Sequence, residues 1–235
     1  MVIQVTTGGP IESIGPLNPN IEPNFSSLAA AIADDLDDTT GEYSPQIQQA
    51  IYAAIRYCER EPYYFNQTRD ITFPTVDGRQ FYDAADHPQI PRLVRIEAAY
   101  TEDAQGQRSP LLRWHQEEIE LMADNSAARG EPYAFCYYDQ KFRLYPIPGA
   151  AVYTVRLQLS PYRLGPITNG SDSNAWTVEA FDMIKARAKY IVYKDTLKEA
   201  TLAAEALADY EDQHRSLKAE TSRRNGTGVV RATCF

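Results

Sequence analysis

The feature that most constrains the fold is a change in hydrophobic period after Pro62. Before this residue, apolar side chains recur every three or four positions, as in amphipathic helices. After it, apolar and polar residues alternate, as in strands with one buried face. From about residue 176 the helical period returns. Because helices and strands are segregated along the chain, the sequence predicts an α+β fold with helices at both ends.

Two helices are expected over residues 25–62. The first begins at Phe25, after Asn24, which can cap it. The second begins at Ser44-Pro45, because serine is a good cap and proline suits the first helical position. Pro62 is expected to end this second helix. The expected apolar stripes consist of Phe25, Leu28, Ile32 and Leu36 in the first helix, and Ile47, Ile51, Ile55 and Cys58 in the second.

Residues 63–165 are expected to form an antiparallel, sandwich-like sheet region. Asp77-Gly78 suits a tight hairpin turn, with Phe81 on the return strand. A short helix over about 115–124 interrupts the strands, with Ile119 and Met122 as its apolar contacts. The alternating apolar residues that predict further strands are Ile71 and Phe73; Val94, Ile96, Ala98 and Tyr100; and Tyr153, Val155, Leu157 and Leu159.

The segment 130–148 has the most specific pattern. Gly130-x-Pro132 suits a turn, and an aromatic strand over 132–138 and a return strand over 142–145 follow. Pro148 cannot donate a ladder hydrogen bond and therefore marks an edge or an end. The pattern is typical of an ordinary aromatic hairpin, and it equally suits a surface used for assembly.

Helices are expected again over 176–222, after a polar loop. Thr177 is the expected cap of the first of them. The run Thr196–Glu199 has the form of a capping box, which predicts that a new helix starts there. The alternatives are a helical hairpin broken near Lys194–Asp195 and one continuous long helix. Residues 25–222 are expected to form one structural unit, with a flexible arm over 1–24 and an extended tail over 223–235.

The net charge of −9 is concentrated at one end of the chain. Residues 1–55 carry seven acidic residues and no lysine or arginine, so this segment disfavours tight binding of nucleic acid. Catalytic, metal-binding and cofactor-binding motifs are not recognised in the sequence, and we expect no enzymatic activity and no cofactor. None of the three histidines has a cysteine, an aspartate or a second histidine at ligand spacing, and the two potential ligands of His115-x-x-Glu118 would make only a weak metal site. No apolar run is long enough to span a membrane.

The order of elements and the segment 130–148 resemble the head-to-tail adaptor (connector, or head completion) proteins of tailed bacteriophages. The resemblance is most specific at Gly130-x-Pro132 and at Phe142-x-Leu144-Tyr145-Pro146-x-Pro148, and the run at 56–65 is similar to the family's transition from second helix to sheet. It covers roughly residues 25–222. The family carries no catalytic motif.

The resemblance implies a structural protein of the virion, assembled in the host cytoplasm, which forms a ring, usually of twelve copies, on the portal protein. Such a ring extends the DNA channel, lets the genome pass without sequence-specific binding, and presents a surface to a tail protein of the nozzle or tail-completion type. No membrane is involved. The alternative function, from the sixteen tyrosines, is a tail-associated carbohydrate-binding β-sandwich module.

Two groups of residues are candidate contact sites. Four carboxylates crowd the end of the first helix, where they oppose the helix dipole, and we expect them to face the channel or a partner rather than only solvent. A basic tail can grip carboxylates on a partner, so we expect the tail to dock on the portal. The acidic cluster is Asp34, Asp35, Asp37 and Asp38, and the docking residues of the tail are Arg223, Arg224, Arg231 and Phe235.

Overall fold

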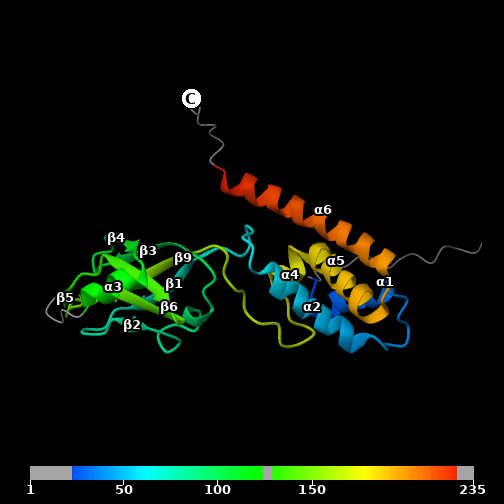
Figure 1. The fold of residues 1–235 in the computed structure, drawn as a ribbon, viewed down its shortest axis with the longest axis horizontal. Helices are drawn as coiled ribbons and strands as arrows, with labels where there is room; N and C mark the ends of the chain where they lie inside the picture. The colour runs from blue at the N-terminus through cyan, green and yellow to red at the C-terminus, as the bar shows by residue number, and fades with distance from the viewer. Residues whose placement is uncertain (1–22, 124–128, 227–235) are drawn as a thin grey trace, which may run out of the picture.

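The computed structural model describes residues 23–123 and 129–226, which form two lobes (Figure 1). One lobe contains helices from both ends of the chain, and the other contains the sheet. Each lobe has its own core of buried apolar residues. The α+β class is therefore confirmed, with two N-terminal helices, a curled and mostly antiparallel sheet, and a long C-terminal helix.

The first two helices are α1 (Phe25–Asp35) and α2 (Ser44–Cys58). Asn24 caps α1 as expected, because its side chain accepts a hydrogen bond from the backbone N–H of Ser27 at 2.9 Å. The expected cap of α2 is wrong: Ser44 lies inside the helix and Tyr43 occupies the cap position. Of the predicted stripes, Leu36 and Ile55 are only partly buried, and the other members are buried.

The helical lobe is completed by α4 (Ala175–Val178), α5 (Phe181–Ile191) and α6 (Ala200–Asn225). Asn174, rather than Thr177, is the cap of α4, and Thr177 completes its capping box from inside the helix. The helical hairpin is confirmed and the continuous helix is wrong. A π-helical turn over Val192–Leu197 ends α5, and the chain reverses at Lys198, whose φ is +60°.

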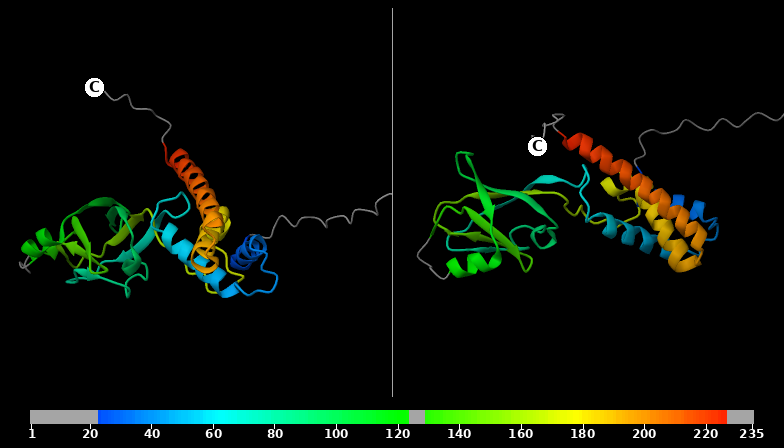
Figure 2. Two further views of the ribbon diagram at one scale, coloured as in Figure 1. Left: turned by 45° about the vertical axis from the view of Figure 1, so that its right-hand side comes forward. Right: turned by 45° about the horizontal axis from the view of Figure 1, so that its top comes forward.

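The predicted capping box at the start of α6 is wrong. Glu199 occupies the cap position of α6 and makes no side-chain capping hydrogen bond. The helix ends later than expected, at Asn225, so the two arginines placed at the start of the tail are helical. Figure 2 shows α6 lying along α5, with its C-terminal end pointing back toward the sheet lobe.

The sheet lobe is built on seven strands in the order β1-β9-β3-β4-β6-β7-β2. All neighbours are antiparallel except β4 and β6, and α3 lies in the crossover between these two. The strands are β1 (Thr68–Pro74), β2 (Phe81–Tyr82), β3 (Ile96–Glu102), β4 (Arg108–Arg113), β6 (Ala134–Tyr138), β7 (Lys141–Tyr145) and β9 (Thr154–Leu159). Three short elements complete the lobe: the 3₁₀ turn η1 (Ile90–Arg92) and the paired strands β5 (Arg129–Gly130) and β8 (Ile147–Pro148).

The aromatic hairpin β6–β7 is confirmed, with Asp139 and Gln140 as its turn. Both turn residues have positive φ, +50° and +58°, as a type I′ turn requires. Phe135 and Phe142 stack at 4.9 Å between ring centroids inside the core. The helix α3 (Gln116–Ala123) is confirmed with Ile119 buried, but Met122 is 47% exposed and is not an apolar contact of the core.

Two expectations for the sheet are wrong. The Asp77-Gly78 turn does not join neighbouring strands, because β1 pairs with β9 and β2 pairs with β7. In β3 the expected alternation fails after Ile96, because a bulge between Ile96 and Ala98 moves Ala99 and Thr101 to the buried face. The alternation in β9 is confirmed throughout.

The first prediction concerns the core of the sheet lobe. Phe142→Ala removes a side chain with no exposed surface, so we expect the free energy of unfolding to fall by about 3–5 kcal/mol. Denaturant unfolding followed by tyrosine fluorescence measures the change. The matched control is Tyr138→Ala in the same hairpin, which is 66% exposed and should change stability by no more than about 0.5 kcal/mol. Equal losses would contradict the assignment of Phe142 to the core.

Candidate functional site

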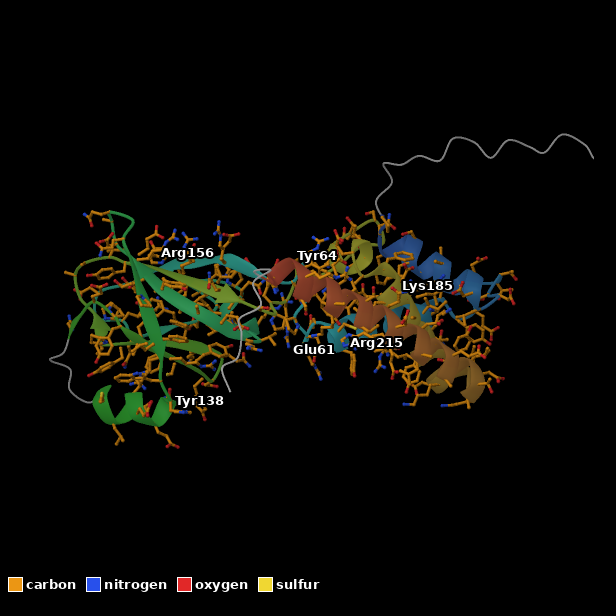
Figure 3. All side chains as sticks on the ribbon, turned by 90° about the horizontal axis from the view of Figure 1, so that it is seen from above. Glu61, Tyr64, Tyr138, Arg156, Lys185 and Arg215 are labelled. Carbon is orange, nitrogen blue, oxygen red and sulfur yellow. The ribbon has the colours of Figure 1, made fainter. Side chains whose placement is uncertain are left out.

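The four acidic residues near the end of α1 have different surroundings. Asp35 makes ion pairs with two lysines of α5, at 3.0 Å to Lys185 and 2.8 Å to Lys189. Lys185 is labelled in Figure 3, on the helical lobe beside α1. Burial favours the neutral carboxyl, but the hydrogen bonds and charges of Lys189 and Lys185 outweigh it and lower the pKa of Asp35. Asp35 therefore ties α1 to α5.

Asp38 stabilises the loop that leads into α2. Its carboxylate accepts hydrogen bonds from the backbone N–H of Glu42 at 3.0 Å and of Tyr43 at 2.9 Å. Slight desolvation acts to raise its pKa, but the backbone donors of Tyr43 and Glu42 outweigh it, so the pKa of Asp38 lies below its ordinary value. This carboxylate therefore orders the loop before α2, whose N-terminus has no side-chain cap of its own.

Asp34 and Asp37 are the two members of the cluster that remain available for a partner. Both are exposed, and within the described residues neither carboxylate makes a hydrogen bond or an ion pair. Asp37 also has a positive φ of +54°, so it forms part of the tight turn that ends α1. Within the described residues, Asp34 and Asp37 are therefore the members of the acidic cluster whose carboxylates are not engaged by other groups, and a contact of the four residues with the channel or a partner stays a prediction.

The structure describes only two of the four predicted docking residues of the tail. Arg223 and Arg224 lie in the last turn of α6, which corrects the expectation of an extended tail at these two positions. Arg223 is exposed. Arg224 pairs with Glu220 at 2.5 Å, and its guanidinium lies 3.7 Å from the ring centroid of Tyr64. Arg231 and Phe235 lie outside the described residues.

The end of α6 is fastened to the linker between α2 and β1, a contact that the sequence did not reveal. The backbone N–H of Tyr64 donates to the Thr221 hydroxyl at 3.1 Å, and Lys218 pairs with Glu61 at 2.6 Å. Figure 3 shows the labelled Glu61 and Tyr64 beside the C-terminal part of α6. We call the contacts of residues 61–64 with Lys218, Thr221 and Arg224 the linker clamp.

A buried polar group lies beneath the linker clamp. The hydroxyl of Tyr63 is 2.7 Å from Nδ1 of His214, and the two aromatic rings meet edge to face. Burial, followed by the charge of Lys218, lowers the pKa of His214. Arg187 of α5 lies over the ring of Tyr57 at 4.0 Å and also contacts Tyr210. These side chains hold α2, α5 and α6 together, so the histidine has a structural role.

Most of the large apolar side chains that are exposed belong to the sheet lobe. The aromatic hairpin contributes Tyr138, 66% exposed and labelled in Figure 3, and Tyr133 precedes β6. The inward-facing aromatics of the hairpin form the core instead. The exposed apolar residues of this lobe are Val76, Phe81, Val94, Leu112, Leu121, Met122, Tyr133, Tyr138 and Val152. We call this set the sheet-lobe apolar surface.

The described residues contain no cluster of side chains suited to bind a metal ion. In residues 23–123 and 129–226, no group of three or more histidine, cysteine or acidic residues is placed to hold a metal ion. Glu118, which is close to His115 in sequence, accepts a hydrogen bond from the backbone N–H of His115 at 3.0 Å and caps α3. Within the same part of the chain, no helix is sufficiently long and apolar to cross a membrane.

The described residues show no metal-binding group, and their exposed features are apolar side chains on the sheet lobe and carboxylates on the helical lobe. A family model described as SU10 adaptor protein matches residues 23–232. The chain therefore belongs to the SU10 adaptor protein family, and the expected relation to bacteriophage head-to-tail adaptors is confirmed. No curated protein matches the chain. The protein is a phage adaptor and, as such, a structural component of the virion.

The second prediction concerns Asp35. We expect Asp35→Asn to lower the free energy of unfolding by up to about 1 kcal/mol, because it removes a partly exposed pair with two lysines. The pKa of Asp35 is lowered in the folded state, so its contribution is present above the ordinary pKa of 3.8 and is lost as the pH falls through the folded-state pKa.

The measurement is denaturant unfolding of both proteins between pH 7 and pH 3. The control is Asp34→Asn one position earlier, which removes the same charge with no described partner and should leave stability nearly unchanged. The ion-pair explanation would be contradicted if the difference in free energy of unfolding between wild type and Asp35→Asn stayed constant over this pH range.

Proposed function

We propose that this adaptor docks as a ring, of twelve copies, on the portal of the filled head, extends the DNA channel and provides the attachment surface for the tail. The match of residues 23–232 to the SU10 adaptor family is the observation that carries the proposal. It also favours this function over the carbohydrate-binding alternative. The adaptor has no enzymatic role in this proposal and acts by shape and contact.

The sheet-lobe apolar surface supports assembly with other proteins. Single exposed apolar residues are normal, whereas a contiguous exposed patch marks an interaction surface, and in this proposal the exposed residues of the sheet lobe form such a patch. Tyr133 and Tyr138 offer large areas at low entropic cost and carry a hydroxyl, which suits interfaces between subunits. Ring interfaces that are obligate commonly bury more than about 2,000 Å² in total. We therefore assign the contacts between neighbouring copies mainly to the sheet lobe.

The acidic pair supports passage of DNA. Asp34 and Asp37 are exposed. Negative charge on a channel wall repels the phosphates of DNA, so an acidic wall lets the genome slide past. Asp35 and Asp38 are close to them in sequence, but their carboxylates are already engaged by lysines and by backbone N–H groups, respectively. In this proposal the pair faces the channel, and the portal contact is made by Arg223 and by the residues after α6, with Arg231 and Phe235 among them.

The third prediction tests the proposal directly. Mixing the purified chain with its cognate portal should give complexes in which a ring of this protein lies under the portal, visible by electron microscopy and by native mass. A variant that stops after Gly226 keeps α6 intact and should bind portal much more weakly. A full-length chain that stays monomeric and ignores the portal would overturn the proposal, and unchanged binding by the short variant would exclude residues 227–235, with Arg231 and Phe235, as docking residues.

The fourth prediction concerns the acidic pair. Asp34→Lys with Asp37→Lys should leave the fold intact but slow DNA ejection from assembled particles several-fold at low salt, because lysines on the channel wall attract phosphate. High salt should remove the effect. The matched control is Glu117→Lys with Glu131→Lys on the sheet lobe, two exposed acids with no described partner. Ejection that is equally fast in all three particles would place the pair away from the DNA.

A further inference from the structure

An open cleft of about 580 Å³ lies between the two lobes, under the end of α6. Its floor comes from the sheet lobe, at the beginning of β1 and the end of β9, and its rim comes from the linker and from the last residue of α6. The residues that line it are Tyr64, Gln67, Thr68, Arg69, Glu97, Gln158, Leu159, Ser160 and Asn225. We call it the inter-lobe cleft.

The linker clamp fixes the place at which the chain leaves α6. Thr221 and Arg224 hold the last turn of the helix against Tyr64, which itself lines the cleft. The helix ends at Asn225 on the rim, and Gly226 has an extended backbone conformation, with φ −71° and ψ 137°. Whatever follows Gly226 therefore starts at the mouth of the inter-lobe cleft.

The sequence after Gly226 has a chemistry that suits this cleft. Residues 227–235 include Val229, Val230 and Thr233, which favour an extended strand, and an aromatic residue at Phe235. Nine extended residues span about 30 Å, which is more than enough to cross a cleft that opens beside their starting point.

The cleft offers partners for both the backbone and the charge of this segment. β1 is an edge of the sheet, and within the described residues it pairs only with β9. At its beginning the carbonyl of Arg69 already accepts a hydrogen bond from Arg156, and the N–H of Asp70 donates to the Thr68 hydroxyl. The remaining outer backbone groups can pair with an added segment. The cleft is lined by one acidic side chain, Glu97, and by one basic side chain, Arg69. Glu97 is exposed and makes an ion pair with Arg95 at 2.9 Å. Arg231 is the charged residue of the segment 227–235 and complements that carboxylate.

We propose that residues 227–235 bind in the inter-lobe cleft of their own chain, along the beginning of β1. The occupant is this segment, in cis, and its side chains replace solvent on a surface formed by both lobes. The inference does not rest on docking to the portal, since it concerns the free chain. If the portal proposal also holds, residues 227–235 leave the inter-lobe cleft when they bind to the portal.

The cysteines allow a sharp test in the intact chain. Cys58 and Cys136 are buried, and burial raises the pKa of both thiols, that of Cys58 to about 11, so both react slowly with oxidants. Cys234 lies in the segment in question. Gln158→Cys places a second thiol in the inter-lobe cleft. The matched control is Ala219→Cys, an exposed position on α6 that is also within reach of the segment.

The rate of disulfide formation under mild oxidation is followed by peptide mass spectrometry and by electrophoresis without reductant. We expect an intrachain bond between Cys234 and the new cysteine to form at least tenfold faster at position 158 than at position 219. Equal rates would show a segment that does not occupy the cleft and would overturn the proposal. A bond that forms only between chains would also overturn it, in favour of a second copy as the source of the segment.

A second measurement does not depend on new cysteines. Hydrogen exchange of the full chain is compared with that of a variant that stops after Gly226. We expect the amides at the beginning of β1, around Thr68, to exchange several-fold faster in the shorter variant, whereas those of α2 stay unchanged. Identical exchange in the two proteins would contradict occupation of the cleft. Either negative result leaves the portal experiment above unaffected.

Discussion

The structure depends on one set of contacts, the linker clamp between the end of α6 and residues 61–64. Lys218 pairs with Glu61, Thr221 accepts the backbone N–H of Tyr64, and Arg224 lies on the ring of Tyr64. Individually, exposed pairs of this kind contribute little. Their position matters more, because the linker is one of the two chain segments that join the lobes. By holding it, α6 determines both the surroundings of the inter-lobe cleft and the point at which the chain leaves the folded body.

The sequence was sufficient for the elements whose hydrophobic period is strong and local. The helices at both ends, the aromatic hairpin and the alternation in β9 follow from spacing alone, and the family resemblance followed from their order. Helix starts were less predictable. At Ser44, Thr177 and Thr196 a good cap residue was present, yet the fold places each of them inside or before its helix. A capping preference of about 1 kcal/mol is outweighed by packing.

The pairing of strands and the candidate contact residues could not be predicted, because both depend on residues distant in sequence. Nothing near Asp77-Gly78 indicates that β1 pairs with β9, and a single bulge in β3 reverses the faces of the residues after it. Likewise, four neighbouring aspartates look equivalent in the sequence. Lysines of α5, about 150 residues away, engage Asp35 and thereby separate it from Asp34.

The helical lobe is assembled from the two ends of the chain, with the sheet lobe between them, and this arrangement fixes an order of events during synthesis. Once residue 159 has left the ribosome, every strand of the seven-stranded sheet is present, and that lobe can close around its own core. Meanwhile α1 and α2 have been made first, but part of their apolar surface, with Leu28, Ile32 and Ile51, stays uncovered until α5 has been synthesised. These early helices are thus among the last parts of the fold to be shielded from water, and during that interval their exposed apolar surface favours aggregation of the nascent chain.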